Sequence, residues 1–237
     1  MRKVLLGTVA AALMLALGVG APAQAATHHV DQVHHSSKAH RSQKASVSIL
    51  HAVPGTPVDV YLNHKRIINN FQPGTLTAAL KVKPGTYTVS ITAATAKNDK
   101  NPIIGPARLR FYPRHNYTVV AHLDASGAPT ATNYYNPVGR TPKGQGRLIV
   151  RHDAAAPPVD VFANGVRSMQ GLTNPRESKL NVPAGTYSVA VALSGTTAPV
   201  IGPADIVVKK RQDTIVYAWG SAAQGNLTVA VQRVKTH

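Results

Sequence analysis

The chain repeats itself, and this internal duplication constrains its fold more than any other feature of the sequence. Residues 47–63 (VSILHAVPGTPVDVYLN) match residues 148–164 (LIVRHDAAAPPVDVFAN) at an offset of 101. Three further blocks of the first copy, VKPGTYTVSI, PIIGPARL and YTVVAH, recur in the same order at offsets of 100, 97 and 96. Four matches in one order indicate two copies of one structural unit with small loop deletions. We therefore expect two tandem domains of about 90 residues each.

Within each copy, apolar and polar residues alternate. Tyr87, Val89 and Ile91 point one way in TYTVSI, and the hydroxyl residues between them point the other way. This period of two predicts strands with one buried and one wet face, which is typical of antiparallel sheets. Asn164-Gly165 predicts a two-residue hairpin. The predicted fold class is all-β: two tandem immunoglobulin-like antiparallel β-sandwich domains with seven or eight short strands each, a barrel being the alternative.

The predicted organisation has five parts. They are a signal peptide (1–25), a disordered His-rich leader (26–45), a first sandwich (46–138), a Gly/Pro linker (139–146) and a second sandwich (147–237). The PIIGP and PVIGP motifs are interpreted as rigid crossovers between sheets. Trp219 aligns with Leu123 at the end of a core strand, which predicts burial. The core of the first copy is expected to contain Val47, Ile49, Val58, Val60, Val82, Tyr87, Val89, Ile91, Leu109 and Val119, together with their partners in the second copy.

The N-terminus indicates export. Arg2-Lys3 precedes an uncharged run from Val4 to Val19, and small residues lead to Ala25, so we predict a signal peptide cut after Ala25. A retained anchor is the other interpretation, but the run is short for a span of about 20 apolar residues. We expect a secreted protein without a transmembrane anchor in the mature chain, with non-covalent association with the cell wall as an option.

The repeated blocks also carry a family resemblance. A strand opening to His, then P-V-D-V-[YF]-x-N, then P-G-T-Y or A-G-T-Y, and then P-[IV]-I-G-P closely resembles the domain-of-unknown-function 4397 family. The resemblance covers residues 46–236 as two such domains. It implies an exported bacterial protein with a sandwich-like β domain, and it implies no substrate, reaction or catalytic residue.

The charge of the chain points to anionic partners. Lys and Arg number 26 against nine Asp and Glu, and removal of Arg2 and Lys3 lowers the net charge from +17 to +15. The charge is spread, with +6 on residues 46–138 (nine basic, three acidic) and +5 on residues 147–237 (ten basic, five acidic). Such a field attracts polyanions, so anionic cell-wall polymers or polysaccharides are the expected partners. Simple solubility is the competing explanation. Aromatic residues are only 5%, so we expect no specific nucleic-acid recognition.

The sequence contains few of the residues and motifs that catalysis commonly uses. The sequence has no cysteine and no G-x-S-x-G motif, so we expect a non-catalytic protein without a cofactor. His51 and Asp59, with their counterparts His152 and Asp160, could form a general-base pair, but their repetition favours a structural role. A hydrolase is therefore the least favoured interpretation.

Two groups of residues remain as candidate binding sites. The leader could bind Zn²⁺, Cu²⁺ or Ni²⁺ through imidazoles, although a polar tether is favoured because nothing holds four ligands in a defined geometry. Its histidines are His28, His29, His34, His35 and His40. Tyr134 and Tyr135 are candidates for a ligand contact or a contact between the domains, because at least one of two consecutive strand residues must face outward. They support the alternative function, a module that recognises carbohydrate or protein.

Overall fold

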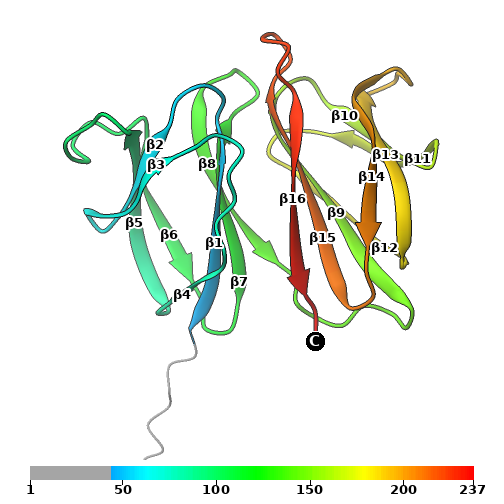
Figure 1. Ribbon diagram of the computed structural model, residues 1–237, viewed down its shortest axis with the longest axis horizontal. Coiled ribbons are helices and arrows are strands. Elements are labelled where there is room, and N and C mark those ends of the chain that lie inside the picture. Colours follow the sequence, from blue (N-terminus) through cyan, green and yellow to red (C-terminus); the bar gives the residue numbers. More distant parts are fainter. Residues whose placement is uncertain (1–43) are drawn as a thin grey trace, which may run out of the picture. The chain divides into compact units, whose positions relative to one another are not determined.

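The computed structural model describes residues 44–237, which form sixteen strands and no helix (Figure 1). The predicted signal peptide and all but the last two residues of the predicted leader lie outside this part. The first repeat contains β1 (Ala45–Ala52), β2 (Val58–Leu62), β3 (Lys65–Phe71), β4 (Leu80–Val82), β5 (Gly85–Ala93), β6 (Ile104–Phe111), β7 (Asn116–Leu123) and β8 (Pro129–Asn136). The second contains β9 (Gln145–Ala155), β10 (Val159–Ala163), β11 (Val166–Leu172), β12 (Glu177–Pro183), β13 (Gly185–Leu193), β14 (Pro199–Val208), β15 (Gln212–Ser221) and β16 (Thr228–Lys235).

Each repeat is a sandwich of two four-stranded sheets. We call β4-β1-β7-β8 and β12-β9-β15-β16 the inner sheets, and β3-β2-β5-β6 and β11-β10-β13-β14 the outer sheets. The predicted all-β class with two sandwich domains is confirmed, and the separate sheets settle the choice against a barrel. The likeness to immunoglobulin domains lies in the two packed layers, because in those domains the first strand shares a sheet with the second. Here β1 lies between β4 and β7 and pairs with β7 in parallel, as β9 does with β15.

The inner sheets of the two repeats pack against each other. One buried apolar cluster joins Leu50 and Val120 of the first repeat to Ile149, Ile215 and Tyr217 of the second. Strands β7 and β15 therefore bury nearly every residue. The prediction of one wet face per strand is wrong for these central strands, because the other repeat covers the face that would otherwise meet water. On the edge strands β3 and β14 most residues are exposed.

The apolar core of each sandwich follows the predicted alternation. In the first repeat Val47, Ile49, Val58, Val60, Val89, Ile91 and Val119 are buried, whereas Val82, Tyr87 and Leu109 are half-buried against them. The predicted hairpin at Asn164-Gly165 is confirmed, with φ of 50° and 77° joining β10 to β11. The Asn164 side chain also accepts the amide of Ser188 at 2.9 Å, which holds the turn to β13.

The strand register corrects one of the sequence offsets. Val47 pairs with Tyr117, and its counterpart Leu148 pairs with Thr214, so β7 corresponds to β15 at an offset of 97. The offset of 96 drawn from YTVVAH was one residue short. A slip of one residue turns every side chain to the opposite face of its strand. Trp219 consequently corresponds to His122, not to Leu123, and its ring packs over Gly74 of the first repeat.

The PIIGP motif does not cross between sheets. Residues from Ile104 onward form β6, which pairs with β5 in the same outer sheet across a register shift. Gly105 has a φ of 91°, and a Cβ atom there would lie 2.5 Å from the carbonyl oxygen of Val89. The glycine is therefore required by the close approach of two backbones at a bulge. The prediction failed because a Gly-Pro pair marks a bulge as readily as a sheet change.

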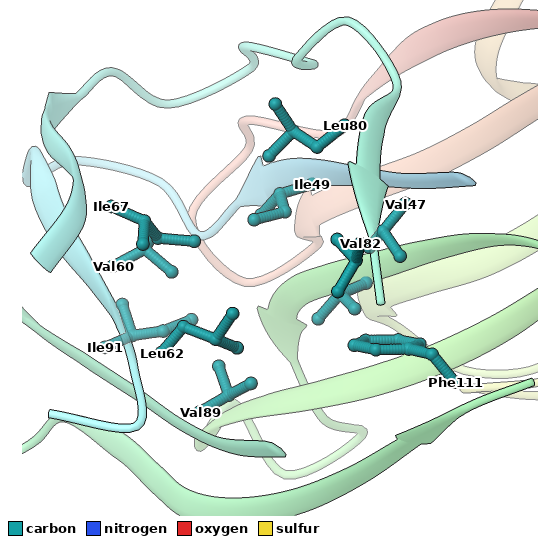
Figure 2. A pocket seen from close by; sticks show the side chains of 11 residues that line it. Val47, Ile49, Val60, Leu62, Ile67, Leu80, Val82, Val89, Ile91 and Phe111 are labelled. Atoms are coloured by element: carbon teal, nitrogen blue, oxygen red, sulfur yellow. The ribbon is translucent and has the colours of Figure 1, made fainter. Parts of the chain in front are cut away.

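A small apolar cavity lies between the two sheets of the first repeat. Figure 2 shows its aliphatic and aromatic lining, in which Ile49 and Leu80 come from the inner sheet and Val60 and Ile91 from the outer sheet. Its volume is about 30 Å³, close to that of one water molecule, and none of its lining residues is polar. An apolar space of this size stays dry and has no room for a ligand. We therefore treat it as a packing void.

A buried arginine is the centre of the polar part of the inter-repeat contact. Arg151 is fully buried on β9, where the first repeat has Leu50 at the corresponding position. Its Nε donates to Glu177 at 2.8 Å, its Nη1 donates to the Tyr217 hydroxyl at 2.8 Å, and its guanidinium lies 4.2 Å from the ring centroid of Tyr134. Every charged edge of the guanidinium thus meets an acceptor or an aromatic face, which a buried arginine requires.

Further hydrogen bonds from this arginine cluster cross between the repeats. The Tyr134 hydroxyl donates to Asp153 at 2.7 Å, and the Thr118 hydroxyl donates to Gln232 at 2.8 Å. Gln232 also accepts from Tyr217 of its own repeat at 2.5 Å. Burial raises the pKa values of Tyr134, Tyr217 and Asp153. The tyrosines therefore remain protonated donors at neutral pH.

We predict that Arg151→Leu destabilises the protein by about 3 kcal/mol, because it leaves buried partners of the arginine unsatisfied. The double variant Arg151→Leu/Asp153→Ala, which copies Leu50 and Ala52 of the first repeat, should recover part of that loss, because it also removes a buried carboxylate that Arg151→Leu leaves without its neighbouring cation. Urea unfolding monitored by fluorescence measures both. Equal stability of Arg151→Leu and the unmodified protein would contradict the prediction.

Candidate ligand-binding surface

The structure separates the two predicted tyrosines. Tyr134 is 7% exposed and belongs to the arginine cluster between the repeats, whereas Tyr135 is 45% exposed. The alternation along β8 explains the difference, because consecutive strand residues face opposite sides. The five leader histidines, His28, His29, His34, His35 and His40, lie outside the described residues. Among residues 44–237, no three His, Asp or Glu side chains gather as metal ligands.

The candidate His–Asp pairs do not form. His51 and His152 are buried, and each Nε2 donates to a backbone carbonyl at 3.0 Å, that of Thr56 and that of Pro157 respectively. Each Nδ1 accepts a backbone amide, from Val53 at 3.4 Å and from Ala154 at 3.3 Å. Burial lowers the pKa of both imidazoles, so both remain neutral with both nitrogens satisfied. These histidines fasten the loop after β1 and the loop after β9.

The two aspartates bind the neighbouring strand instead. Asp59 accepts from the Arg66 guanidinium at 2.9 Å and from the amide of Asn70 at 2.8 Å. Asp160 accepts the amide of Gly171 at 2.8 Å, which lowers the pKa of its carboxyl, and it also pairs with Arg167. Each carboxylate therefore joins a central strand of the outer sheet to its edge strand across a bulge.

An exposed aromatic cluster surrounds Tyr135. The His115 ring centroid lies 5.2 Å from that of Tyr135 and 5.7 Å from that of Tyr112, and all three residues are exposed. Tyr112 and His115 belong to the turn between β6 and β7, and Tyr135 is on β8 beside β7. We call Tyr112, His115 and Tyr135 the aromatic platform. Sequence reasoning identified only Tyr135 of the three.

The corresponding turn of the second repeat is basic. By the structural offset of 97, Tyr112 corresponds to Lys209 and Arg114 to Arg211, and both arginines have a positive φ, of 62° and 54°. Tyr135 corresponds to Arg233, because these residues pair with Tyr117 and with its counterpart Thr214. The same backbone position thus carries aromatic side chains in one repeat and cations in the other.

The basic turn and the linker between the repeats form one concave surface. It contains Arg140 and Lys143 of the linker and Lys210 and Arg211 of the β14–β15 turn, which we call the basic groove. The amide of Arg211 donates to the carbonyl of Gln145 at 3.2 Å, which holds the turn to the start of β9. In the described part of the chain, no Asp or Glu side chain lines this groove. Four cations on fixed backbone can attract an anionic chain.

The nearest carboxylate to this surface along the chain is withdrawn into the protein. Asp213, two residues after Arg211, is buried and accepts from Arg147 at 2.9 Å. Burial raises the pKa of Asp213 to about 6 despite this arginine. Arg147 also donates to the carbonyl of Pro137 at 3.0 Å, so the pair ties β15 to the residues just before the linker. The carboxylate therefore supports the groove without facing it.

Comparison with known families agrees with the repeated motifs. Residues 45–162 match the family model described as a domain of unknown function, DUF4397. The chain carries a DUF4397 domain. The match runs through the first repeat and ends in β10 of the second, and the second repeat is tied to the first by its sequence and by the same strand order. No curated protein matches the chain in a sequence search.

The DUF4397 match and the fold leave the aromatic platform and the basic groove unassigned. The sequence carries a signal for both in the turns before the YTVV and DTIV strands. At an offset of 97, residues 112–115 (YPRH) of the first copy align with residues 209–212 (KKRQ) of the second. The incorrect offset of 96 hid this correspondence.

No helix formed by residues 44–237 has the length and apolarity that crossing a bilayer requires.

We predict that acid stabilises the protein through Asp213. Its pKa is raised on folding, so its contribution to stability is present at low pH and is lost as the pH rises through about 6. When the pH is lowered from 7 to 5, the free energy of unfolding of the unmodified protein should rise by about 1 kcal/mol more than that of Asp213→Asn, whose side chain does not titrate. Urea unfolding of both proteins at the two pH values measures this. A parallel pH dependence of the two proteins would show the prediction to be wrong.

Proposed function

We propose that this protein is an exported, non-catalytic module that binds anionic polymers of the cell envelope through the basic groove. The observation that carries the proposal is the convergence of Arg140, Lys143, Lys210 and Arg211 from two separate segments on one concave surface. The high net charge of the chain without its predicted signal peptide, +15, adds a long-range attraction for polyanions to this local site. The predicted signal peptide supports export, where wall polymers and acidic polysaccharides are the available partners.

The arrangement of the titratable side chains supports a binding role over a hydrolytic one. His51 and His152 bond to backbone groups, and Asp59 and Asp160 bond to arginines and amides of an adjacent strand. Buried His122 bonds to the Thr132 hydroxyl at 2.9 Å, and buried Asp153, 3.8 Å from His122, accepts from Tyr134. Each of the first four groups stabilises a loop or a bulge, which is a structural role. The alternative of carbohydrate recognition keeps support from Tyr135, which is exposed within the aromatic platform.

We predict that changing Arg140, Lys143, Lys210 and Arg211 together to Gln weakens polyphosphate binding at least tenfold, because the local field falls with these four charges. The slope of log affinity against log salt should also become shallower, since fewer counterions are released. Fluorescence titration at three salt concentrations gives both quantities.

The matched control changes four exposed cations of the first repeat, Lys65, Lys97, Lys100 and Arg108, to Gln. It removes the same net charge and should alter affinity less than threefold. Equal losses in the two variants would mean that the charge acts as a diffuse field, and the basic groove would then not be the site.

We further predict that the protein in its native cells fractionates with the wall and is extracted as salt rises from about 0.1 to 1 M, as the screening length falls from about 10 to 3 Å. Immunoblots of medium, wall, membrane and cytoplasm follow it. Retention that does not depend on salt, or a cytoplasmic location, would contradict the proposed function.

A further inference from the structure

We propose that the aromatic platform is a stacking site for a sugar ring and that Arg110 and Arg114 beside it bind the acid group of that sugar. The inference rests on the proposed function and narrows its ligand to a polysaccharide with carboxylate-bearing rings. The platform then supplies selectivity for ring polymers, and the basic groove supplies general attraction to anions.

The ring geometry suits a puckered sugar. His115 makes interplanar angles of 50° with Tyr112 and 52° with Tyr135, so the three rings form an angled surface and not one plane. A pyranose presents an uneven apolar face of C–H groups, which can contact two tilted aromatic faces at once. A flat nucleobase would stack on a single ring. The tyrosine hydroxyls also place donors at the edge of the surface, where sugar hydroxyls would lie.

The platform is ordered before any ligand arrives. His115 stacks on the buried ring of Tyr117 at an interplanar angle of 17°, and its Nδ1 donates to the carbonyl of Pro113 at 2.8 Å. The Tyr117 hydroxyl accepts the amide of Tyr112 at 3.3 Å, and the amide of Ser46 donates to the carbonyl of His115 at 2.9 Å. A ligand would therefore have little side-chain or loop freedom to freeze, which favours binding.

The charges beside the platform suit a carboxylate. The Arg110 guanidinium lies 5.1 Å from the ring centroid of Tyr112, and Arg114 is exposed in the same turn. Within residues 44–237, no carboxylate lies within ion-pair distance of either arginine. A guanidinium can bind a carboxylate through two parallel hydrogen bonds. Arg140 of the basic groove follows Tyr135 by five residues, so the Cα atoms of the two residues lie at most about 18 Å apart.

The second repeat shows that the fold does not require these aromatic residues. Lys209, Gln212 and Arg233 occupy the positions of Tyr112, His115 and Tyr135 in a turn with the same positive φ at its third residue. Exposed aromatic rings reduce solubility and need a reason beyond folding. The same comparison supplies a test variant, Tyr112→Lys/Tyr135→Arg, whose side chains the second repeat already tolerates.

The test titrates the chain without its predicted signal peptide with polygalacturonate, which has charged rings, with polyphosphate, which has charge alone, and with neutral dextran. For Tyr112→Lys/Tyr135→Arg we expect about tenfold weaker binding of polygalacturonate and equal or tighter binding of polyphosphate. If binding were purely electrostatic, the two added positive charges would make this variant bind both polyanions more tightly than the unmodified protein, and that result would overturn the inference. Tyr112→Ala/Tyr135→Ala should also bind polygalacturonate more weakly, and its affinity for polyphosphate should stay within twofold of that of the unmodified protein. Circular dichroism and the melting temperature establish that each variant is folded.

The control and the competitor separate the remaining outcomes. Phe162→Ala removes a half-buried ring of the second repeat that lies under Arg167, and it should leave both affinities unchanged. Loss of polygalacturonate binding in this variant would overturn the inference. A single-stranded oligonucleotide that displaces polygalacturonate at equal concentration would also overturn it, in favour of base stacking. If the unmodified protein binds polyphosphate and shows no preference for polygalacturonate, the sugar-stacking role of the aromatic platform is contradicted and the proposed function stands. If it binds neither polyanion, the stacking role and the proposed function are both contradicted.

Discussion

The packing of one inner sheet against the other is the interaction on which the rest of the structure depends. It covers the second face of β1, β7, β9 and β15, so these strands lie in the middle of a four-sheet stack and not at a wet surface. Because β8 contributes Tyr134 and β9 contributes Arg151, the contact also fixes both ends of the linker. The linker and the β14–β15 turn can then hold the four cations of the basic groove in constant positions, although they belong to separate segments.

The buried polar groups make this contact specific for one pair of sheets. Leu50 and Ala52 of the first repeat occupy the positions that Arg151 and Asp153 occupy in the second, so the two surfaces are related in backbone and different in chemistry. Two identical apolar faces would pair equally well with a second copy of themselves. Arg151 bonds to Tyr217 and Glu177 of its own repeat, but the ring of Tyr134 and the carbonyl of Tyr135 come from the first repeat, so other pairings would leave the arginine less well satisfied. We interpret the cluster as a device that specifies which sheets pair, at some cost in stability relative to an apolar contact.

Much of the fold could be predicted from local sequence, and the main errors concern the central strands β7 and β15. Alternation, the Asn164-Gly165 turn and the duplicated blocks are local signals, and they yielded the two sandwiches and most of the core correctly. The burial of β7 and β15 on both faces is a tertiary effect, and Thr118 and His122 look like wet positions until the other repeat covers them. The offset of β15 was wrong by one residue because YTVVAH and DTIVYA alternate so weakly that two registers match equally well. Only the pairing of Leu148 with Thr214 decides between them.

That one-residue error also bears on the candidate site, because function in a duplicated protein is most visible where equivalent positions differ. At the correct offset, the turn before β7 and the turn before β15 share a backbone conformation but differ in chemistry, Tyr112 and His115 standing opposite Lys209 and Gln212. Backbone geometry cannot explain this difference, since the same turn accepts both sets of side chains. Residues that the fold requires recur in both repeats, as His51 and His152 do with the same bonds to the same backbone groups. The repeat therefore acts as an internal reference: what recurs belongs to the frame, and what differs on the exposed turns is available for recognition.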